Sequence, residues 1–246
     1  MVYFFYDFDI PSFKKTITEV LEFDCNGLLF APIFHDESIE FLDKYSQKHI
    51  PVTLIDSDIQ HRIPHFYIGQ DAFKSGYLAG RLISFAVKEQ REVLVIKITR
   101  DIESTSVYLQ RIKGFYAYFD ENPLITNFKF TELSVRESDI DHLDVEMFAN
   151  TSSVFIPNSR AYIIARFLEE KNIKGIRIIG YDLLEKNIQH LNSGSIDFLI
   201  NQKPQEQGYQ AVQYLYKKVV LQEDLTSNII IPLEIIVKEN YISTES

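Results

Sequence analysis

The sequence has almost no cysteine and no long apolar run. Cys25 is the one cysteine among 246 residues, so the chain cannot form an internal disulfide. This fits a reducing compartment, and it also fits many periplasmic proteins. We expect Cys25 to be a small buried apolar residue and not a nucleophile. No stretch reaches eighteen consecutive apolar residues, so we predict no membrane span.

Basic residues are also scarce. The chain has 25 Lys and Arg against 35 Asp and Glu, giving a formal net charge of -10 and a pI near 5.1. This balance argues against this chain holding a phosphate backbone by itself, and no basic segment is present. The opening residues, MVYFFYDFD, lack the basic start of a signal peptide and carry Asp7 and Asp9. These residues are predicted to form a strand that begins at the first residue, so we expect that preceding sequence is missing.

The signatures of several enzyme classes are absent as well. There is no GxGxxG after a strand and no GxxxxGK[ST], which argues against dinucleotide and P-loop sites. There is no GxSxG elbow, and Ser193 to Ser195 lie in a turn between a helix and a strand. His61 and His65 have i, i+4 spacing, but Pro64 prevents the helix that would aim both at one zinc ion. We therefore predict a protein that is not an enzyme and has no metal or cofactor.

The sequence does have a regular alternation of strand and helix patterns. The length and the 46% hydrophobic content fit one large domain or two of about 120 residues. The helix from Asp71 carries small residues that allow close packing on a sheet, and the helix from Pro204 to about Val220 is predicted to face inward through Tyr209, Val212, Leu215 and Tyr216. A further helix is expected around 143–148. Strands are expected at 2–6, 28–31, 52–55, 66–68, 93–98, 128–131, 154–157, 176–179, 196–200 and 229–237. Such alternation predicts an α/β fold with mostly parallel sheet and helices on both faces.

Two polar residues follow neighbouring strands of one predicted βαβ unit. Asp182 comes after the strand at 176–179, and Gln202 comes after the strand at 196–200. In open α/β sheets ligands bind outside the carboxyl ends of the strands, so both side chains can face one crevice. The alternatives are that Asp182 is a helix N-cap and that Gln202 is an ordinary loop residue.

The candidate binding residues are planar polar groups with fixed donor and acceptor geometry. Such groups bind vicinal hydroxyls in pairs, and an aromatic ring can cover the C–H side of a sugar. Nothing among them would activate a nucleophile, so the set favours reversible binding of a polyhydroxy ligand over catalysis. The polar candidates are Asp56, Asn158, Asp182, Gln202 and Arg111, and the aromatic candidates are Phe34 and Tyr181.

Six segments in series resemble the effector-binding domain of lactose-repressor-type (LacI) transcription regulators, which has the fold of the ribose-binding periplasmic protein. The resemblance implies two Rossmann-like lobes joined by three crossover strands, with the ligand in the cleft. The first lobe would hold residues 1–70 and 204–231, and the second 71–203 and 232–246. It further implies that Asp71 lies near the cleft, and that Asp56, Arg111, Asn158, Asp182 and Gln202 contact the ligand. The segments are 67–82, 111–119, 155–170, 178–194, 200–212 and 231–241.

The sequence departs from the LacI pattern in ways that affect the site and the first lobe. Ser57 stands where many sugar binders have a basic residue, and Ser159 stands where an acidic residue is common. The family begins with a strand, a ligand-contacting loop and a helix before the strand that Val2 to Tyr6 resembles. That unit and any helix-turn-helix are missing here. We therefore expect an incomplete first lobe whose edge strand is exposed unless something covers it.

The resemblance implies a ligand-sensing domain of a cytoplasmic transcription regulator. It would bind a small effector, expected to be a sugar, form a homodimer and act on DNA through a domain absent from this chain, with no membrane partner. The alternative is a periplasmic sugar-binding protein that serves a transporter or receptor. A signal peptide or a helix-turn-helix in the upstream reading frame would separate the two.

Overall fold

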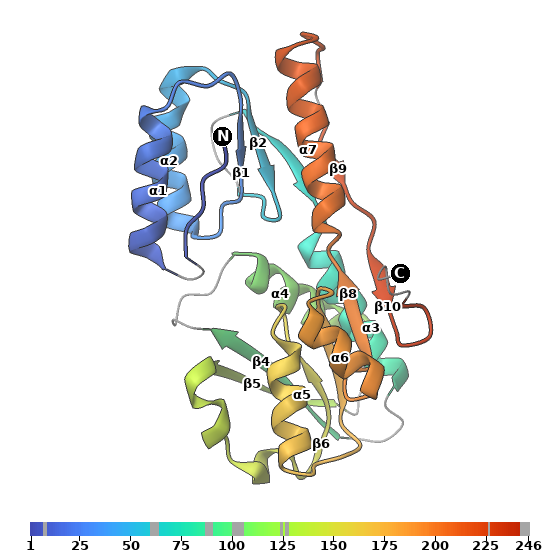
Figure 1. Cartoon of the computed structure of the whole chain (residues 1–246). Coiled ribbons are helices and arrows are strands. Elements are labelled where there is room, and N and C mark those ends of the chain that lie inside the picture. The colour runs from blue at the N-terminus through green and yellow to red at the C-terminus, as the bar shows by residue number, and fades with distance from the viewer. Residues whose placement is uncertain are drawn as a thin grey trace. The chain divides into compact units, whose positions relative to one another are not determined.

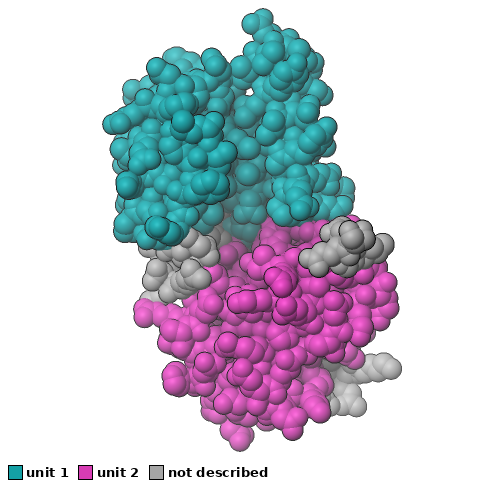
Figure 2. All heavy atoms as spheres, viewed as in Figure 1, with its two compact units in different colours: residues 1–70, 105–107, 203–232 teal, residues 71–104, 108–202, 233–246 magenta. Residues whose placement is uncertain are grey.

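The computed structural model describes residues 1–6, 9–59, 64–86, 91–99, 106–123, 125, 128–225 and 227–241. The chain divides into two compact units (Figure 2). Unit 1 comprises Met1–Gln70, Thr105–Val107 and Lys203–Pro232, and unit 2 comprises Asp71–Ser104, Tyr108–Gln202 and Leu233–Ser246. Each unit has its own sheet and its own buried core.

Unit 1 contains a four-stranded parallel sheet in the order β1-β2-β3-β9. Helices α1 and α2 cover one face of this sheet, and α7 covers the other (Figure 1). Helix α1 begins where the Asp9 side chain accepts a hydrogen bond from the Ser12 backbone N–H, with Pro11 in the first turn. The strands are β1 (Leu28–Phe30), β2 (Val52–Ile55), β3 (Phe66–Gly69) and β9 (Ile229–Ile230), and the helices are α1 (Ile10–Glu22), α2 (His35–Tyr45), the 3₁₀ turn η1 (Ser46–Lys48) and α7 (Pro204–Val219).

Unit 2 contains a six-stranded sheet in the order β10-β8-β7-β6-β4-β5. All neighbouring strands are parallel except β10 and β8. Helices α3 and α4 pack on one face, and α5 and α6 pack on the other. The predicted α/β fold is confirmed. The strands are β4 (Arg91–Thr99), β5 (Phe128–Arg136), β6 (Thr151–Phe155), β7 (Arg177–Tyr181), β8 (Phe198–Asn201) and β10 (Glu234–Ile236), and the helices are α3 (Ala72–Ala86), α4 (Ser106–Glu121), α5 (Ala161–Glu170) and α6 (Glu185–Ser193).

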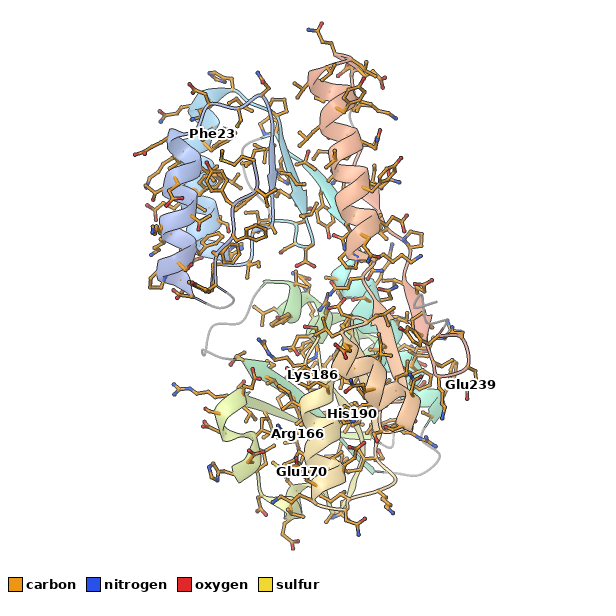
Figure 3. All side chains as sticks on the ribbon, in the orientation of Figure 1. Phe23, Arg166, Glu170, Lys186, His190 and Glu239 are labelled. Carbon is orange, nitrogen blue, oxygen red and sulfur yellow. The ribbon has the colours of Figure 1, made fainter. Side chains whose placement is uncertain are left out.

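Strand β4 shows why the sheet of unit 2 is buried on both faces. Successive side chains of a strand point to opposite faces. Val93 and Val95 pack with α3 and α4, whereas Leu94 and Ile96 pack with α5 and α6. An unbroken apolar run is therefore what a central parallel strand requires. Arg166 and Glu170 of α5, in contrast, lie on the outer side of their helix (Figure 3).

The predicted strand at Val2 to Tyr6 is wrong. These residues pair with no described strand, and Phe4 is 84% exposed. Their polar backbone atoms bond to α1 instead, because the Thr16 hydroxyl donates to the Phe4 carbonyl and the Tyr6 N–H donates to the Ser12 hydroxyl. A segment with high β-propensity thus lies along a helix without forming a ladder.

Two further elements differ from their predictions for local reasons. The helix expected around 143–148 is a pair of 3₁₀ turns, η2 (Glu137–His142) and η3 (Val145–Phe148). Asp144 caps the second turn through the Glu146 backbone N–H, a local bond that competes with α-helix. The long strand expected at 229–237 is interrupted at Pro232, which has no N–H to donate. Its two halves, β9 and β10, belong to different sheets.

Helix α7 is rotated relative to the prediction. Tyr209, Val212 and Tyr216 are exposed, while Gln207, Ala211 and Tyr214 form the buried face. The prediction chose the face with the larger number of large apolar residues. The buried face instead contains a glutamine and an alanine, so that choice was wrong. Tyr209, Val212 and Tyr216 therefore form an exposed apolar stripe on α7.

Candidate functional site

Arg111 of α4 lies at the centre of a polar network at the carboxyl ends of three strands of unit 2. Its side chain is 3% exposed. Arg111 Nη1 donates to the carbonyl of Pro157, which follows β6, at 2.9 Å. Arg111 Nη2 donates to Oε1 of Gln202, which follows β8. The guanidinium therefore links the ends of strands that are far apart in the sequence.

Two glycines allow α3 and α4 to approach closely enough to place Arg111. A Cβ atom on Gly76 would lie 1.8 Å from the Arg111 carbonyl oxygen. A Cβ atom on Gly114 would lie 1.9 Å from the carbonyl oxygen of Phe73. Backbone thus meets backbone at both points of the helix crossing, and any larger residue would force the helices apart. Gly76 therefore allows α3 to pack closely on α4, whereas the sequence interpretation expected it to allow close packing on a sheet.

The aromatic ring of Tyr181 packs against the guanidinium of Arg111. The Arg111 Cζ atom lies 3.8 Å from the centroid of the Tyr181 ring, a cation–π contact. The Tyr181 hydroxyl lies 3.1 Å from the Ser75 hydroxyl. Burial raises the pKa of Tyr181, so its hydroxyl stays neutral at physiological pH. Because Tyr181 is fully buried, its ring faces Arg111 and not solvent.

Gln202 connects Arg111 to Asp182. Its Oε1 accepts from Arg111, and its Nε2 donates to Asp182 Oδ2 at 2.7 Å. The two bonds fix which end of the amide faces each partner. Asp182 adopts a left-handed conformation with φ of 68°, and its N–H donates to the Ile200 carbonyl at 3.0 Å. Such a conformation is held in place by the surrounding bonds.

Asn158 has a structural task in this network. It is 1% exposed, and its side-chain amide donates to the Ile98 carbonyl at 2.8 Å. Its Oδ1 accepts from the Arg160 backbone N–H at 3.1 Å. The side chain thereby ties the end of β4 to the turn after β6.

The other predicted residues lie elsewhere. Asp71 caps α3 by accepting from the Lys74 N–H at 2.9 Å. Asp56 follows β2 in unit 1, has φ of 66° and donates its backbone N–H to Gln207 Oε1 at 2.9 Å. Phe34 is buried in unit 1 against Phe13, with ring centroids 5.2 Å apart. The structure therefore brings together Arg111, Asn158, Tyr181, Asp182 and Gln202, and places Asp56 and Phe34 in the other unit.

Asn187 and Gln207 were missed by the sequence interpretation. Asn187 is fully buried, and its amide donates to the carbonyls of Ser159, Tyr181 and Asp182 at 2.9, 2.9 and 3.1 Å. One signal was available, because Asn187 shares a helix face with buried Leu191 at i+4, and Gln207 shares one with Ala211. A polar residue on a buried helix face is a residue with a bonding task.

The network offers charged and neutral hydrogen-bonding groups at one edge of the sheet. A guanidinium, a carboxylate and an amide lie within one chain of hydrogen bonds, which suits a ligand that both donates and accepts. Arg111 Nε is buried and has no hydrogen-bond partner among the described residues. Within that same part of the chain, no group of three His, Cys, Asp or Glu side chains could hold a metal ion. His61 lies outside the described residues, so the expectation that His61 and His65 do not bind a zinc ion together is not tested.

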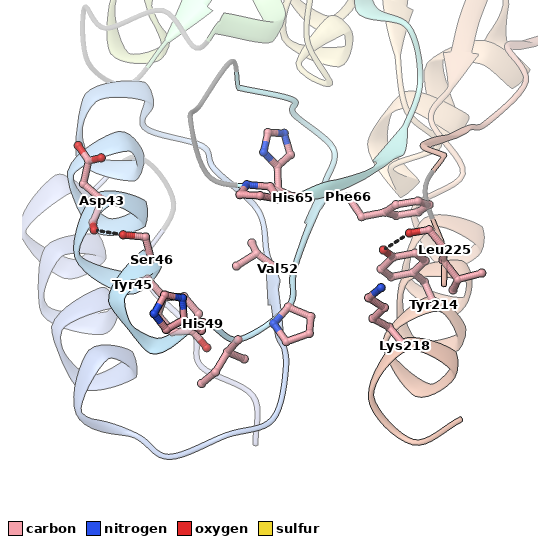
Figure 4. A pocket seen from close by; sticks show the side chains of 13 residues that line it. Asp43, Tyr45, Ser46, His49, Val52, His65, Phe66, Tyr214, Lys218 and Leu225 are labelled. Carbon is pink, nitrogen blue, oxygen red and sulfur yellow. Dashed lines mark hydrogen bonds between the residues drawn. The ribbon is translucent and has the colours of Figure 1, made fainter. Parts of the chain in front are cut away.

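A separate cavity of about 870 Å³ lies in unit 1, near the amino ends of β2 and β3 (Figure 4). Tyr214 and Phe66 stack in its wall with ring centroids 3.5 Å apart. His65 Nε2 lies 2.9 Å from Asp58 Oδ1, and Lys218 Nζ lies 3.5 Å from Asp224 Oδ1. The residues that line this cavity include none of the predicted binding residues.

Comparison with known proteins places the chain in a family. The profile of a family described as "Periplasmic binding protein domain" matches residues 2–223. The chain belongs to this family. No curated protein matches the sequence. None of the described helices is long and apolar enough to cross a membrane.

Solved structures with the periplasmic-binding-protein fold are similar over nearly the whole chain. A candidate LacI transcriptional regulator from Bacteroides fragilis is 26% identical with a TM-score of 0.86, and the match covers 96% of this chain and 83% of that protein. GanP, a glucose-galactose binding protein from Geobacillus stearothermophilus, is 20% identical with a TM-score of 0.82, covering 94% and 83%. An ABC transporter solute-binding protein from Burkholderia graminis, in complex with D-arabinose, is 17% identical with a TM-score of 0.84, covering 96% and 83%. The last two likenesses establish the fold alone.

Proposed function

We propose that this chain is the ligand-sensing domain of a LacI-type transcription regulator and that its ligand is a small polyhydroxy molecule, by class a sugar. The observation that carries the proposal is the hydrogen-bond chain from Arg111 through Gln202 to Asp182. A sugar hydroxyl is both donor and acceptor, so it needs groups of both kinds held at fixed positions. Charge-assisted bonds to Arg111 and Asp182 would supply the strongest contacts.

The relatives support sugar as the ligand class. GanP is a glucose-galactose binding protein, and the protein from Burkholderia graminis was solved with D-arabinose. Asp56 and Asp71 belong to the proposal as further ligand contacts from the ends of β2 and the start of α3. Asn158 contributes by fixing the turn after β6, whatever contact it makes with the ligand.

The regulator is favoured by the Bacteroides fragilis protein, whose identity of 26% exceeds the 20% of GanP and the 17% of the Burkholderia graminis protein. A cytoplasmic homodimer acting on DNA through another domain belongs to this proposal. A sugar would shift the DNA-bound state by no more than its difference in affinity for the two conformations. The second candidate, a solute-binding protein that serves a transporter, is favoured by the similarity in fold to the ABC transporter solute-binding protein from Burkholderia graminis. A helix-turn-helix encoded upstream of Met1 would support the regulator, and a signal peptide would support the carrier.

A thermal-shift screen against monosaccharides, disaccharides, sugar phosphates and nucleosides tests the binding site. A ligand present at a hundredfold excess over its Kd stabilises the folded state by about 2.7 kcal/mol, which raises the Tm by several degrees. Gln202→Met removes both amide bonds at similar side-chain length, so we expect it to abolish the shift. Gln205→Met, at an exposed position three residues away, is the matched control. A full shift in Gln202→Met would rule out this site, and no shift with any compound would argue against a sugar sensor.

A further inference from the structure

Asp56 lies at the centre of a tight turn at the carboxyl end of β2. Its φ is 66°, in the left-handed region, and the Ser57 N–H donates to the Ile55 carbonyl at 2.7 Å. A hydrogen bond between residues two apart around a positive φ makes this a γ-turn of the rare, strained form. Aspartate tolerates left-handed backbone better than most residues, but glycine would adopt it with less strain. The turn alone therefore does not account for an aspartate at this position.

Side chains from two other elements hold both polar backbone groups of Asp56. Its N–H donates to Gln207 Oε1 at 2.9 Å, and its carbonyl accepts from the Tyr67 hydroxyl at 3.2 Å. Gln207 belongs to α7, whereas Tyr67 packs in the cluster under α1 and α2, so the two side chains reach Asp56 from opposite faces of the sheet (Figure 1). A strained conformation persists where the surrounding structure holds it in this way.

The hydroxyl of Tyr67 is itself closely surrounded. Tyr67 is 5% exposed, and its backbone N–H donates to Asn228 Oδ1 at 2.9 Å. Its hydroxyl also donates to the Gln70 carbonyl at 2.9 Å, so one proton is shared between two carbonyl acceptors. A Cβ atom on Gly69 would lie 2.2 Å from the hydroxyl oxygen, so a side chain at position 69 would displace the ring. The absence of a side chain at Gly69 thus lets the Tyr67 hydroxyl reach Asp56.

The amide of Gln207 is explained by its bond to the turn. Gln207 is 3% exposed and shares the buried face of α7 with Ala211 and Tyr214. Buried polar groups in native proteins are hydrogen-bonded, and the Asp56 N–H is one partner of this amide. An apolar side chain of the same length would fill the space on this face but would leave the Asp56 N–H without its acceptor.

The bonds from Tyr67 and Gln207 act on the backbone and leave the Asp56 side chain exposed. A carboxylate accepts hydrogen bonds from hydroxyl groups, and such bonds are stronger than those between neutral groups. A carboxylate on a rigid turn also loses less conformational freedom when it binds.

We propose that Tyr67 and Gln207 are positioning residues that hold the strained turn and so present the Asp56 carboxylate to the sugar. This rests on the proposed function, because the ligand concerned is the sugar of that proposal. The added content is that sugar affinity depends on two buried side chains that act through Asp56. If the turn served only to end β2, substitutions at Tyr67 and Gln207 would change stability and leave the affinity unchanged.

Asp56→Gly tests the strain in the protein without ligand. Glycine adopts the left-handed turn freely, so we expect the Tm to rise by about 2 °C. The same substitution removes the carboxylate and should abolish the thermal shift with sugar. Gln222→Gly is the matched control, because Gln222 is also exposed and left-handed, with φ of 55°. It should raise the Tm similarly and keep the full sugar shift.

Tyr67→Phe and Gln207→Met each remove one of the two bonds to Asp56. The probe is the sugar that gives the largest thermal shift with the natural chain. We expect each variant to raise its Kd about tenfold in titration calorimetry, the effect of one lost hydrogen bond. Tyr45→Phe is the control, because Tyr45 is also fully buried and its hydroxyl lies 3.1 Å from Cys25 Sγ. It should leave the Kd unchanged.

Amide exchange separates the lost bond from a general loss of stability. Gln207→Met should accelerate exchange at the Asp56 N–H about tenfold, because that N–H loses its acceptor. Exchange at Leu54, which is fully buried in the same strand, should not change. Equal acceleration at both amides would overturn the role of Gln207.

The proposed function and the positioning role fail in different ways. If the natural chain responds to no sugar, the proposed function is overturned, whereas exchange at Asp56 still shows whether Gln207 holds the turn. If the natural chain binds sugar and both Tyr67→Phe and Gln207→Met bind it with unchanged Kd, the positioning role is overturned. A lower Tm for Asp56→Gly would show that the turn is not strained.

Discussion

A single buried amide, that of Asn187, holds the turn that carries Asp182. Its NH₂ group is shared by three carbonyl oxygens, and its Oδ1 accepts from the Tyr162 N–H at 2.9 Å. Asp182 can therefore keep its left-handed backbone, and its carboxylate stays beside Gln202. At this scale the site depends on residues that need not touch a ligand.

Asn187→Asp keeps the shape of the side chain but places an oxygen where the NH₂ group meets three carbonyl oxygens. We expect a loss of about 3 kcal/mol in the free energy of unfolding at pH 7, because a buried charge loses its partners. The charged form is disfavoured in the folded state, so the pKa of the new carboxyl is raised. The loss should then be smallest at low pH and should grow as the pH rises through that pKa. Urea unfolding at pH 4 and pH 7 measures it, with the exposed Asn192→Asp as control. An equal loss at both pH values would contradict the account.

Glu92 and Thr131 give a second pH-dependent residue pair, on β4 and β5. The Thr131 hydroxyl donates to Glu92 Oε1, and Lys129 Nζ lies 3.3 Å from Glu92 Oε2. The hydrogen bond from Thr131 is the main cause that lowers the pKa of Glu92. A lowered folded-state pKa contributes stability above the ordinary carboxyl pKa, and that stability is lost as the pH falls through the lowered value.

Thr131→Val removes the hydroxyl and keeps a β-branched side chain in the strand. We expect it to cost about 1 kcal/mol at pH 7. The difference from the natural chain should shrink below the ordinary pKa of Glu92. Thr131→Ser retains the donor and should behave like the natural chain at both pH values. Unfolding curves at pH 7 and pH 3 measure this, and a difference that does not change with pH would show that packing, and not the hydrogen bond, sets the loss.

At the scale of elements, the crossing of α3 and α4 decides where Arg111 lies. Gly114→Ala would bring a Cβ atom to 1.9 Å from the Phe73 carbonyl oxygen, so the helices must separate. We expect a loss of about 2 to 4 kcal/mol and a weaker sugar response, because Arg111 moves with α4. Gly208→Ala in α7 is the control, since its Cβ would meet no atom within 4 Å. It should stabilise the protein by about 0.5 to 1 kcal/mol. Equal effects of the two substitutions in urea unfolding would contradict the role of the crossing.

The elements were predictable where local pattern and tertiary packing agree. β2 was predicted with its observed bounds, because a short run of apolar and β-branched residues is typical of a strand that is buried on both faces of a parallel sheet. The rim positions of Asp182 and Gln202 followed from the βαβ unit, since parallel strands place their carboxyl ends together. The outer face of α7 was not predictable, because Val212 and Tyr216 resemble core residues until the neighbouring surface is known. The prediction of a strand at Val2 to Tyr6 was wrong for a related reason. β-propensity does not specify whether a neighbouring strand is present to pair with the segment.

At the scale of the whole molecule, two cores share one chain that passes between the units repeatedly. The chain moves from unit 1 to unit 2 after Gln70, returns after Gln202 and crosses again after Pro232, and the short segment Thr105–Val107 also belongs to unit 1. Each unit nevertheless buries its own apolar clusters on both faces of its own sheet. Because each unit has its own core, the two units could unfold separately. The repeated passages of the chain between them favour unfolding in one cooperative transition.

We expect unit 1 to unfold at a lower urea concentration than unit 2. Unit 1 has a four-stranded sheet with smaller buried clusters, whereas unit 2 has a six-stranded sheet with larger buried clusters. Hydrogen exchange in increasing urea measures the two units separately, through Leu54 of β2 and Val95 of β4, which are both fully buried. Exchange at Leu54 should accelerate first, and its dependence on urea should be shallower because less surface is exposed. If the two amides exchange together at every urea concentration, the crossings dominate and the molecule unfolds as one cooperative body.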